Sequence, residues 1–402
     1  MEFQSAGLSK GLNKMRTAPN NSGMLCLKIF PVLLALLISF PEGDIYARKG
    51  KTLFFTDLDA RWTVDKAGYG RTASVKPLVR LPLELAWKNR VGRSIGATPS
   101  AADEYIFVTT KDRRIVILNR DSGERVERRT FKGGFGGSVL IQGVRMFFNT
   151  RSPDGKVYCT EINTKEKHIE RKIGPAVSSP ILEQGRLFLF NQFGKVLCLN
   201  PEVGFRNWET QLDGKIEYSS VYIDPFLYVP TLEGNIYKLD SSNGVRSGSL
   251  DLGRHLFGDL SSDGYFLFCA LASGKVICFE PDSLKKEWEV NIGHSVFSGP
   301  VYSNGALYVC TRDGWLVKLA AEDGSQVWKA RLNGIAVAPP SVTGDYAFTG
   351  TKSGDLAAFD IASGERLWSR KIEEGLSASP LVYKDYVYYC SDRGMVYAFH
   401  AK

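Results

Sequence analysis

The amino-acid sequence predicts an all-β fold, an eight-bladed β-propeller of four-stranded blades, over residues 83–402. Three observations predict it: glycines recur about every 40 residues, each period contains four short strand-like segments, and the two ends of the repeat region complement one another. A fixed period of this size is typical of repeat architectures, and four strands per period are typical of propeller blades. The recurring turn glycines are Gly155, Gly194, Gly234, Gly274, Gly314, Gly354 and Gly394.

The clearest copy of the repeat reads G-D-L-A-A-F-D-I-A-S-G-E-R-L-W and begins at Gly354. This glycine predicts a tight turn, because glycine readily takes the positive φ that such turns need. A short alternating strand follows, and a second turn begins at Asp360, whose carboxylate can accept hydrogen bonds from its own turn. A closing strand ends at Trp368. In the first repeat, residues 111–114 form the equivalent first turn, with arginine where glycine is expected.

Small residues and prolines precede each turn by roughly twenty residues and lead into a first strand. A short turn and an aromatic-rich second strand follow, as at residues 386–388 (Tyr-Val-Tyr). The first strands therefore define eight blades, and they begin near residues 98, 138, 179, 220, 260, 300, 340 and 380.

The two ends of the repeat region are incomplete units. Residues 83–88 alternate and contain Trp87, as a fourth strand does, but no blade precedes them. The last unit stops after its third strand, near Phe399. We therefore expect residues 83–88 to complete the last blade, which closes the ring and removes free sheet edges that favour aggregation.

Tryptophan recurs at the end of the fourth strand, and an indole side chain buries about 150–250 Å². We therefore expect these rings to pack between neighbouring blades. The five positions are Trp87, Trp208, Trp288, Trp328 and Trp368. Blades 1, 2 and 4 have other residues near this position, and we expect weaker contacts from each of them to the next blade. These residues are Glu127, Ile169 and Ser247.

The N-terminal 47 residues have the layout of a secretory signal peptide. Lys28 precedes a 12-residue apolar run, residues 29–40, which is short for a membrane span, and a cleavage position follows at Ala47. A start of translation at Met24 gives a signal peptide of ordinary length. An uncleaved signal anchor is the alternative. Cys26 precedes the apolar run and so is not placed as a lipid acceptor. Residues 48–82 do not follow the repeat and are expected to form an extended segment across the propeller.

Removal of the signal peptide leaves 47 basic and 40 acidic residues, a net charge of +7. No block of five or six like charges occurs, which argues against a nucleic-acid partner. The basic residues are densest in the first repeat, where we interpret them as a solvated blade face; attraction of an anionic partner is the alternative. They lie in residues 111–114 and at Arg120, Arg125, Arg128 and Arg129.

Six cysteines follow the signal peptide. We expect free thiols in the core, because buried cysteine commonly serves as a small apolar residue. Cys269 and Cys278 would face each other across a regular hairpin, so a disulfide between them in an oxidising compartment is the alternative.

The pattern A-x-D-x-x-x-G-x-x-x-W, matched by Ala358, Asp360, Gly364 and Trp368, resembles the tryptophan-docking repeat of pyrroloquinoline-quinone-type β-propellers over residues 83–402. In size and blade count the chain is most similar to the non-enzymatic propeller subunit of the outer-membrane β-barrel assembly machinery. The family also contains quinone dehydrogenases, which hold their cofactor on the propeller axis beside Ca²⁺, often with a pair of adjacent cysteines.

The chain departs from the dehydrogenase pattern. It has no adjacent cysteines, no long insertions between blades and no acidic cluster with calcium-loop spacing. Its four histidines (His168, His255, His294 and His400) lie in different blades. We therefore expect no catalytic residues, no metal site and no cofactor, pyrroloquinoline quinone (PQQ) included.

Function is expected on the loops that join one blade to the next, because these loops surround the axis on one face of a propeller. Their tips combine aromatic and aliphatic side chains with basic ones, as protein interfaces do. The alternative is that the apolar tips pack into the funnel wall. The candidate docking residues are Arg93, Phe135, Lys215, Tyr218, Arg254, His255, Phe257, His294, Phe297 and Leu376.

Together these features predict a non-enzymatic, protein-binding or scaffolding β-propeller of the bacterial cell envelope, with a role in outer-membrane protein assembly. It is expected to be exported to the periplasm or the periplasmic face of the envelope, to be monomeric, and to bind an envelope protein. Membrane association is expected only through that partner or an uncleaved signal anchor. A periplasmic sensor of a small ligand and a PQQ-binding oxidoreductase are the alternatives.

Overall fold

A computed structural model describes residues 74–75, 79–151, 155–253 and 255–402. The chain divides into a unit of residues 1–50 and a unit of residues 51–402. The signal peptide predicted at residues 1–47, the start at Met24, and most of the segment 48–82 lie outside the described residues. The part of the chain that the structure describes is built from β-strands alone, and none of it forms an apolar helix of bilayer-spanning length.

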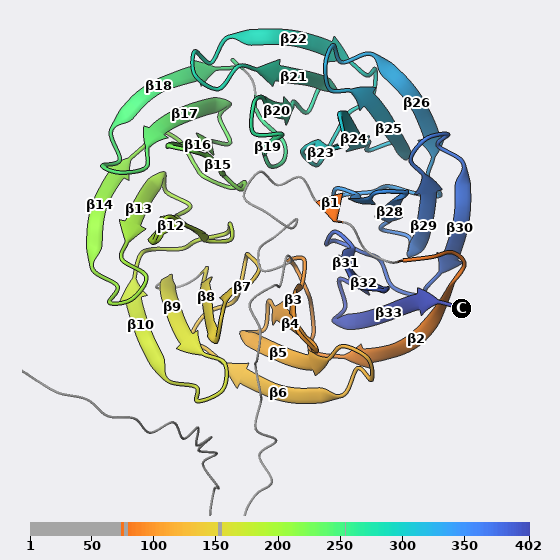
Figure 1. Cartoon of the computed structure of the whole chain (residues 1–402), viewed down its shortest axis with the longest axis horizontal. Helices are drawn as coiled ribbons and strands as arrows, with labels where there is room; N and C mark the ends of the chain where they lie inside the picture. Colours follow the sequence, from red (N-terminus) through yellow and green to blue (C-terminus); the bar gives the residue numbers. More distant parts are fainter. Residues whose placement is uncertain (1–73, 76–78, 152–154, 254) are drawn as a thin grey trace, which may run out of the picture. The chain divides into compact units, whose positions relative to one another are not determined.

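Eight antiparallel sheets are arranged around a common axis, which confirms the predicted eight-bladed propeller (Figure 1). Each blade is a four-stranded meander that runs from the axis to the rim. The innermost strands are β3 (Ser100–Ala102), β7 (Leu140–Gln142), β11 (Ile181–Glu183), β15 (Val221–Ile223), β19 (Ser261–Ser262), β23 (Val301–Ser303), β27 (Ser341–Thr343) and β31 (Leu381–Tyr383). The second strands are β4 (Tyr105–Thr110), β8 (Arg145–Asn149), β12 (Arg186–Phe190), β16 (Phe226–Pro230), β20 (Leu267–Ala270), β24 (Ala306–Cys310), β28 (Tyr346–Gly350) and β32 (Tyr386–Cys390).

The third and fourth strands form the outer half of each blade. The third strands are β5 (Arg114–Asn119), β9 (Lys156–Glu161), β13 (Lys195–Leu199), β17 (Asn235–Asp240), β21 (Lys275–Phe279), β25 (Trp315–Ala320), β29 (Asp355–Asp360) and β33 (Met395–Ala401). The fourth strands are β6 (Arg125–Thr130), β10 (Lys167–Lys172), β14 (Arg206–Gln211), β18 (Arg246–Asp251), β22 (Lys286–Asn291), β26 (Gln326–Arg331), β30 (Arg366–Lys371) and β2 (Leu83–Arg90).

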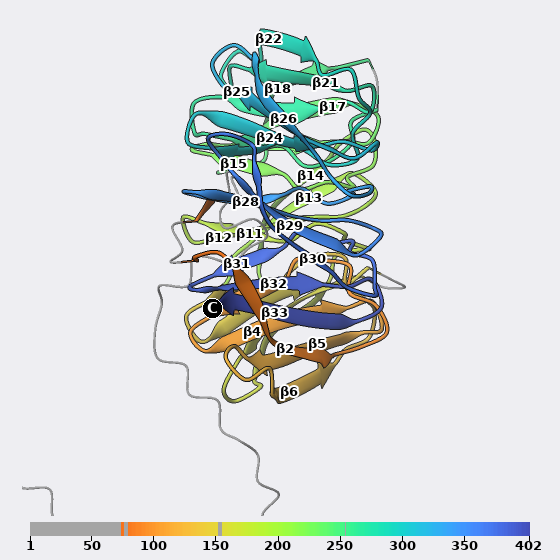
Figure 2. The ribbon, with the colours of Figure 1, turned by 90° about the vertical axis from the view of Figure 1, so that its right-hand side faces the viewer.

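The eighth blade joins the two ends of the propeller. β2 pairs antiparallel with β33, with Leu83 opposite Ala401 and Arg90 opposite Met395. Figure 2 shows the two strands side by side at the rim. The predicted ring closure by residues 83–88 is therefore confirmed. A further short strand, β1 (Ser74–Val75), pairs in parallel with the innermost strand β27 of the seventh blade.

The turn glycines adopt the backbone conformation that the repeat requires. All seven predicted first-turn glycines have positive φ, from +35° at Gly155 to +103° at Gly234. In the first blade Arg113 takes this position with φ +70°. At the second turn of the seventh blade, Asp360 accepts backbone hydrogen bonds from Ala362 at 3.0 Å and Ser363 at 2.7 Å. The donors of Ser363 lower the pKa of the Asp360 carboxyl.

The five tryptophans connect neighbouring blades in one repeated geometry. Each indole N–H donates to a backbone carbonyl of the next blade, as Trp208 does to Ser241 at 3.0 Å. Each of four rings also lies over a second-turn glycine of that blade; a Cβ on Gly244 would lie 2.4 Å from the Trp208 ring. The equivalent acceptors for Trp87, Trp288, Trp328 and Trp368 are the carbonyls of Arg120, Ala321, Ile361 and Leu83.

Other groups take the place of the indole at the three blade contacts that lack tryptophan. After blade 1, the buried Arg129 donates to the carbonyls of Glu161 and Ile162 and pairs with Glu127 at 2.9 Å. After blade 2, Ile169 packs on Gly204, where a Cβ would lie 3.1 Å from the isoleucine. These blade contacts are expected to be weaker because they lack an indole, and in the structure Arg129 and Ile169 supply the contact to the next blade.

The contact after blade 4 differs in register from the prediction. Gly248, and not Ser247, lies opposite Lys238 at the tryptophan position. Leu284 of blade 5 packs towards Gly248. Tyr228 donates to the Pro281 carbonyl at 3.1 Å, in place of an indole N–H.

The six described cysteines are free and buried. Cys269 lies opposite Ile277, and Cys278 lies opposite Phe268. Free core thiols were expected, and the alternative of a disulfide required the two thiols to face each other. This register offsets them by one residue, which sends them to opposite faces of the sheet. Burial raises the pKa of both thiols, that of Cys278 to about 12.

Candidate functional site

One face of the propeller is formed by the eight connecting loops together with the turns between second and third strands; we call it the loop face. A backbone hydrogen bond ties most loops to the turn of the blade that they enter, as Lys111 N–H donates to Ser94 at 2.9 Å and Arg312 N–H to Ser295 at 2.7 Å. The loops span residues 91–99, 131–139, 173–180, 212–220, 252–260, 292–300, 332–340 and 372–380.

The ten candidate docking residues fall into distinct environments on the loop face. Arg93, Lys215 and His255 are exposed, whereas Arg254 lies outside the described residues. The partly exposed side chains are Tyr218, Phe257, His294 and Phe297.

Phe135 and Leu376 were also predicted to dock a partner, and the structure places them in the core instead. They are 2% and 1% exposed. The Phe135 ring packs against Phe131 and Phe148, with centroids 5.9 and 5.6 Å away. Each loop has a buried apolar side chain at this position, which fixes the loop to its blade. The other six are Ile95, Ala176, Ile216, Leu256, Val296 and Ala336.

The 40-residue repeat itself indicates that the position of Phe135 and Leu376 is buried. Ile95, Leu256, Val296 and Leu376 each form an isolated β-bridge to the end of the next blade's second strand. A position that is apolar in all eight repeats is a packing position, whichever residue occupies it.

Phe257 and Phe297 form an aromatic pair from two neighbouring loops. Their ring centroids lie 6.3 Å apart, and the Arg312 guanidinium lies 4.8 Å over the Phe297 ring. Arg312 belongs to a turn between strands, and the sequence-based prediction missed it. A cavity of about 490 Å³ adjoins Phe257 of this pair and is lined by Glu233, Gly253, His255, Phe257, Leu271, Ala272 and Ser273. The pair therefore presents an apolar surface with a cationic edge beside a hollow.

His255 and His294 are held by local contacts. The His255 Nδ1 lies 3.0 Å from the Leu232 carbonyl, and the His294 Nδ1 lies 2.7 Å from the Asp313 carboxylate. Burial acts to raise the pKa of Asp313, but the hydrogen bond from Thr311 and the neighbouring His294 outweigh it and lower the pKa.

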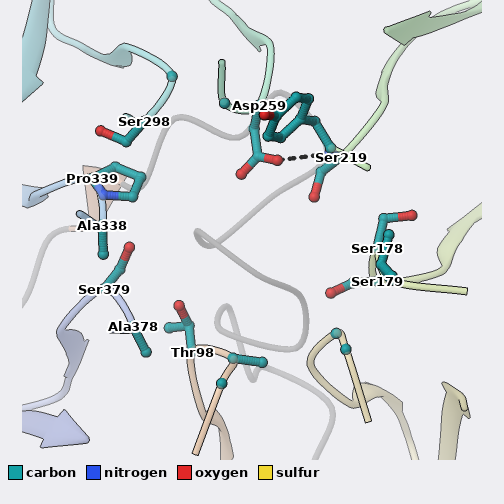
Figure 3. Close-up of a pocket in the computed structure, with 18 of the residues that line it drawn as sticks. Thr98, Ser178, Ser179, Ser219, Asp259, Ser298, Ala338, Pro339, Ala378 and Ser379 are labelled. Atoms are coloured by element: carbon teal, nitrogen blue, oxygen red, sulfur yellow. Dashed lines mark hydrogen bonds between the residues drawn. The ribbon is translucent and has the colours of Figure 1, made fainter. Parts of the chain in front are cut away.

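The axis of the ring contains a cavity of about 200 Å³ that is lined by all eight loops (Figure 3). Most lining residues are small. Asp259 accepts a hydrogen bond from the Ser219 backbone N–H at 2.6 Å, and Glu217 and Tyr218 lie beside it. Burial and these two carboxylates raise the pKa of the Tyr218 hydroxyl to about 12.

The axial cavity does not fit a quinone cofactor. Sites for cofactor-sized molecules are commonly about 300–1,000 Å³, and this one is smaller. Its described lining has two carboxylates and no lysine or arginine, so it would repel the carboxylates of PQQ.

A group of three metal-ligand side chains lies at the rim, away from the axis. Glu161, Glu166 and His168 of the β9–β10 hairpin place their ligand atoms within 4.8 Å of one another. The sequence spacing did not suggest this juxtaposition. The His168 Nε2 to Glu161 Oε1 distance is 3.6 Å, and Glu166 is exposed.

Comparison with known proteins connects the chain with one family. A family model described as outer membrane protein assembly factor BamB matches residues 84–220 and 232–402. A curated relative with the same description, from Burkholderia pseudomallei, is 29% identical over 111 residues. This alignment covers 28% of the present chain and 29% of that relative, so the chain matches less than a third of the relative's length.

Solved structures show the same fold. BamB from Moraxella catarrhalis superimposes with a TM-score of 0.68 at 16% identity, covering 80% of this chain and 98% of that one. A quinohemoprotein alcohol dehydrogenase from Comamonas testosteroni superimposes with a TM-score of 0.73 at 14% identity, covering 85% and 81%. At these identities the likeness shows the fold alone, which BamB and an alcohol dehydrogenase share.

Proposed function

Because this chain belongs to the family of outer membrane protein assembly factor BamB, we propose that it is a non-enzymatic, protein-binding propeller of the bacterial cell envelope that acts in outer-membrane protein assembly. In this proposal the loop face docks on another envelope protein. The propeller acts as a monomer on the periplasmic side, and export through residues 1–47 brings it there. Association with a membrane is through the partner or through an uncleaved signal anchor.

The observation that supports docking most directly is the pair of Phe257 and Phe297 beside a cavity of about 490 Å³. Aromatic side chains and arginine are enriched at the centres of protein interfaces. Arg312 stacks on Phe297, so its guanidinium is fixed in place while its charge stays exposed. A partner side chain that enters the cavity would contact Phe257, and a neighbouring one could reach Phe297 and the guanidinium over it.

Photo-crosslinking in cells tests the proposal. A photoreactive amino acid at position 257 or 297 should capture one dominant envelope protein, identified by mass spectrometry. The matched control is position 205, because Phe205 is 72% exposed but lies in a turn between third and fourth strands, on the opposite face. Equal capture from position 205, or none from 257 and 297 in a folded and exported protein, would contradict docking at the loop face.

The two alternatives depend on the axial cavity and receive less support from it. A small-ligand sensor and a PQQ-binding oxidoreductase both need a site of sufficient size, and this cavity of about 200 Å³ is acidic and lined mostly by small residues. We accordingly propose that the protein acts without a PQQ cofactor. A saturable change in quinone absorbance on titration with PQQ and Ca²⁺ would contradict this.

A further inference from the structure

The loop face of blades 1 and 2 gathers five exposed basic residues from four separate segments. We call Arg93, Lys111, Arg113, Lys132 and Arg151 the cation cluster.

Arg93 and Lys132 lie in connecting loops, and the other three lie in turns between second and third strands. The sequence places only Lys111 and Arg113 close together. The fold brings Arg93, Lys132 and Arg151 alongside them.

Backbone contacts join these segments into one surface. The Lys111 N–H donates to Ser94, next to Arg93, at 2.9 Å. The Arg151 N–H donates to Gly134 at 2.8 Å, and a Cβ on Gly134 would lie 2.7 Å from the Lys111 carbonyl. The Phe131 N–H donates to the Arg113 carbonyl at 3.0 Å, which places Lys132 beside Arg113.

No acidic side chain of the described residues neutralises the cation cluster. None of its five members forms an ion pair with a described residue, although many other charged residues of the rim do. The carboxylate of Asp112, which lies between Lys111 and Arg113 in the sequence, pairs with Arg114 at 3.0 Å. Among the described residues the cation cluster therefore presents a positive charge without an ion-pair partner.

Two features of the backbone bear on how the cluster's side chains are positioned. The Lys111 and Arg151 stems lie against Gly96 and Gly136, where an added Cβ would be 2.4 Å from the Lys111 Cε and 3.1 Å from the Arg151 Cγ. Arg113 occupies the left-handed position that glycine takes in the other seven blades. An arginine is strained in this conformation, and such strain is commonly kept where a side chain serves a function.

We infer that the cation cluster docks an acidic, Asp- and Glu-rich segment of the protein partner that covers the loop face; this inference rests on the proposed function. The cluster lies on the same face as Phe257 and Phe297, so a partner that spans the ring can contact both. A bilayer of anionic lipid is the less favoured occupant, because none of the large exposed hydrophobic side chains of the described residues lies in the segments of the cluster to insert among lipids.

The first test uses the full mature chain and a fluorescent Glu-rich peptide, with a Gln-rich peptide of equal length as the neutral probe. The variant R93E/R113E should bind the Glu-rich peptide at least about tenfold more weakly at about 0.1 M salt, and this difference should vanish near 1 M salt, where charges are screened within about 3 Å. The matched control is R125E/R128E, which changes two exposed cations of β6 on the rim; it should change binding less than about twofold.

Arg113→Gly separates recognition from folding. Glycine relieves the positive φ and removes one charge, so the unfolding midpoint should stay equal or rise while peptide binding weakens about two- to fivefold, the range of one exposed ion pair. Binding that is unchanged in both R93E/R113E and Arg113→Gly would overturn the inference.

The same variants in cells distinguish this inference from the proposed function. Capture from position 257 should fall in R93E/R113E and persist in R125E/R128E. Capture that is unaffected by R93E/R113E overturns the role of the cation cluster and leaves docking at Phe257 intact, whereas an absence of capture in the unmodified background overturns the proposed function. Vesicles of phosphatidylglycerol that bind the wild type, and not R93E/R113E, with no change in capture would instead identify a lipid surface.

Discussion

Gly248 faces Leu284 across the contact between the fourth and fifth blades, with the large and small residues exchanged relative to the tryptophan contacts. Elsewhere a fourth-strand tryptophan lies over a glycine of the next blade. Here glycine takes the strand position, and a Cβ on it would lie 3.4 Å from the Leu284 Cδ1. Leu284 takes φ +57°, close to the +74° and +75° of Gly244 and Gly324 in the equivalent turns. The space between these two blades is thus filled by a side chain of the fifth blade instead of one from the fourth.

This exchange predicts strong coupling between the two positions. Gly248→Trp alone should lower the free energy of unfolding by about 1–3 kcal/mol, because the indole would overlap Leu284. Leu284→Gly removes that overlap, so the double variant should recover most of the loss and gain the indole hydrogen bond. Urea unfolding of the four proteins of the cycle measures the coupling, expected at about 0.5–3 kcal/mol. Additive effects would show that the two residues do not share this space.

Trp208 allows the indole ring and its hydrogen bond to be separated. Trp208→Phe keeps most of the ring but leaves the Ser241 carbonyl without its donor, which should cost about 1–3 kcal/mol. Trp208→Ala should cost about 3–5 kcal/mol, because it also removes the ring from Gly244. Both are measured by urea unfolding at neutral pH. Equal losses in the two variants would mean that the hydrogen bond, and not packing, dominates this contact.

Glu127 and Arg129 predict a pH dependence of the contact after blade 1. Burial acts to raise the pKa of Glu127, but hydrogen bonds and charge from Arg129 and Lys165 outweigh it and lower the pKa. A carboxyl with a folded-state pKa below its unfolded value adds stability above the unfolded pKa of about 4.3, and that stability is lost as the pH falls through the folded pKa. Glu127→Gln should therefore be less stable than wild type at neutral pH and converge with it in acid.

Urea unfolding of both proteins from neutral to acidic pH measures this convergence. The control is Glu166→Gln on the exposed β9–β10 turn, which leaves the pair of Glu127 and Arg129 in place. If the difference in the free energy of unfolding between wild type and Glu127→Gln stayed constant down to acidic pH, the ionised form of Glu127 would not be what stabilises this contact.

The sequence alone predicted the blades because each depends on local chemistry. A glycine every 40 residues fixes the turns, and alternation fixes which side chains face the neighbouring blade. The contacts after blades 1 and 4 could not be predicted in this way, because Arg129 and Leu284 are defined by what they meet across the contact. The cation cluster could not be predicted for the same reason, because its charges come from four segments that only the folded blades 1 and 2 bring together.

The candidate docking loops show the same division between local pattern and tertiary contact. Phe135 and Phe257 are both loop phenylalanines beside glycine, and their immediate neighbours in the sequence do not distinguish them. They stand at different positions of the repeat. Phe135 aligns with the buried Ile95 and Leu256, whereas Phe257 comes one residue after Leu256 and points away from the core.

This difference of one residue predicts opposite consequences for the two phenylalanines. Phe135→Ala should lower the free energy of unfolding by about 3–5 kcal/mol, because it removes a ring that packs against Phe131 and Phe148. Phe257→Ala should change it by less than about 0.5 kcal/mol, because its ring is partly exposed. Crosslinking from position 297 should fall in the folded Phe257→Ala protein, since the partner loses half of the aromatic pair. A Phe135→Ala protein that is as stable as wild type but no longer crosslinks to the partner would show that Phe135 contacts the partner, which contradicts its burial in the structure.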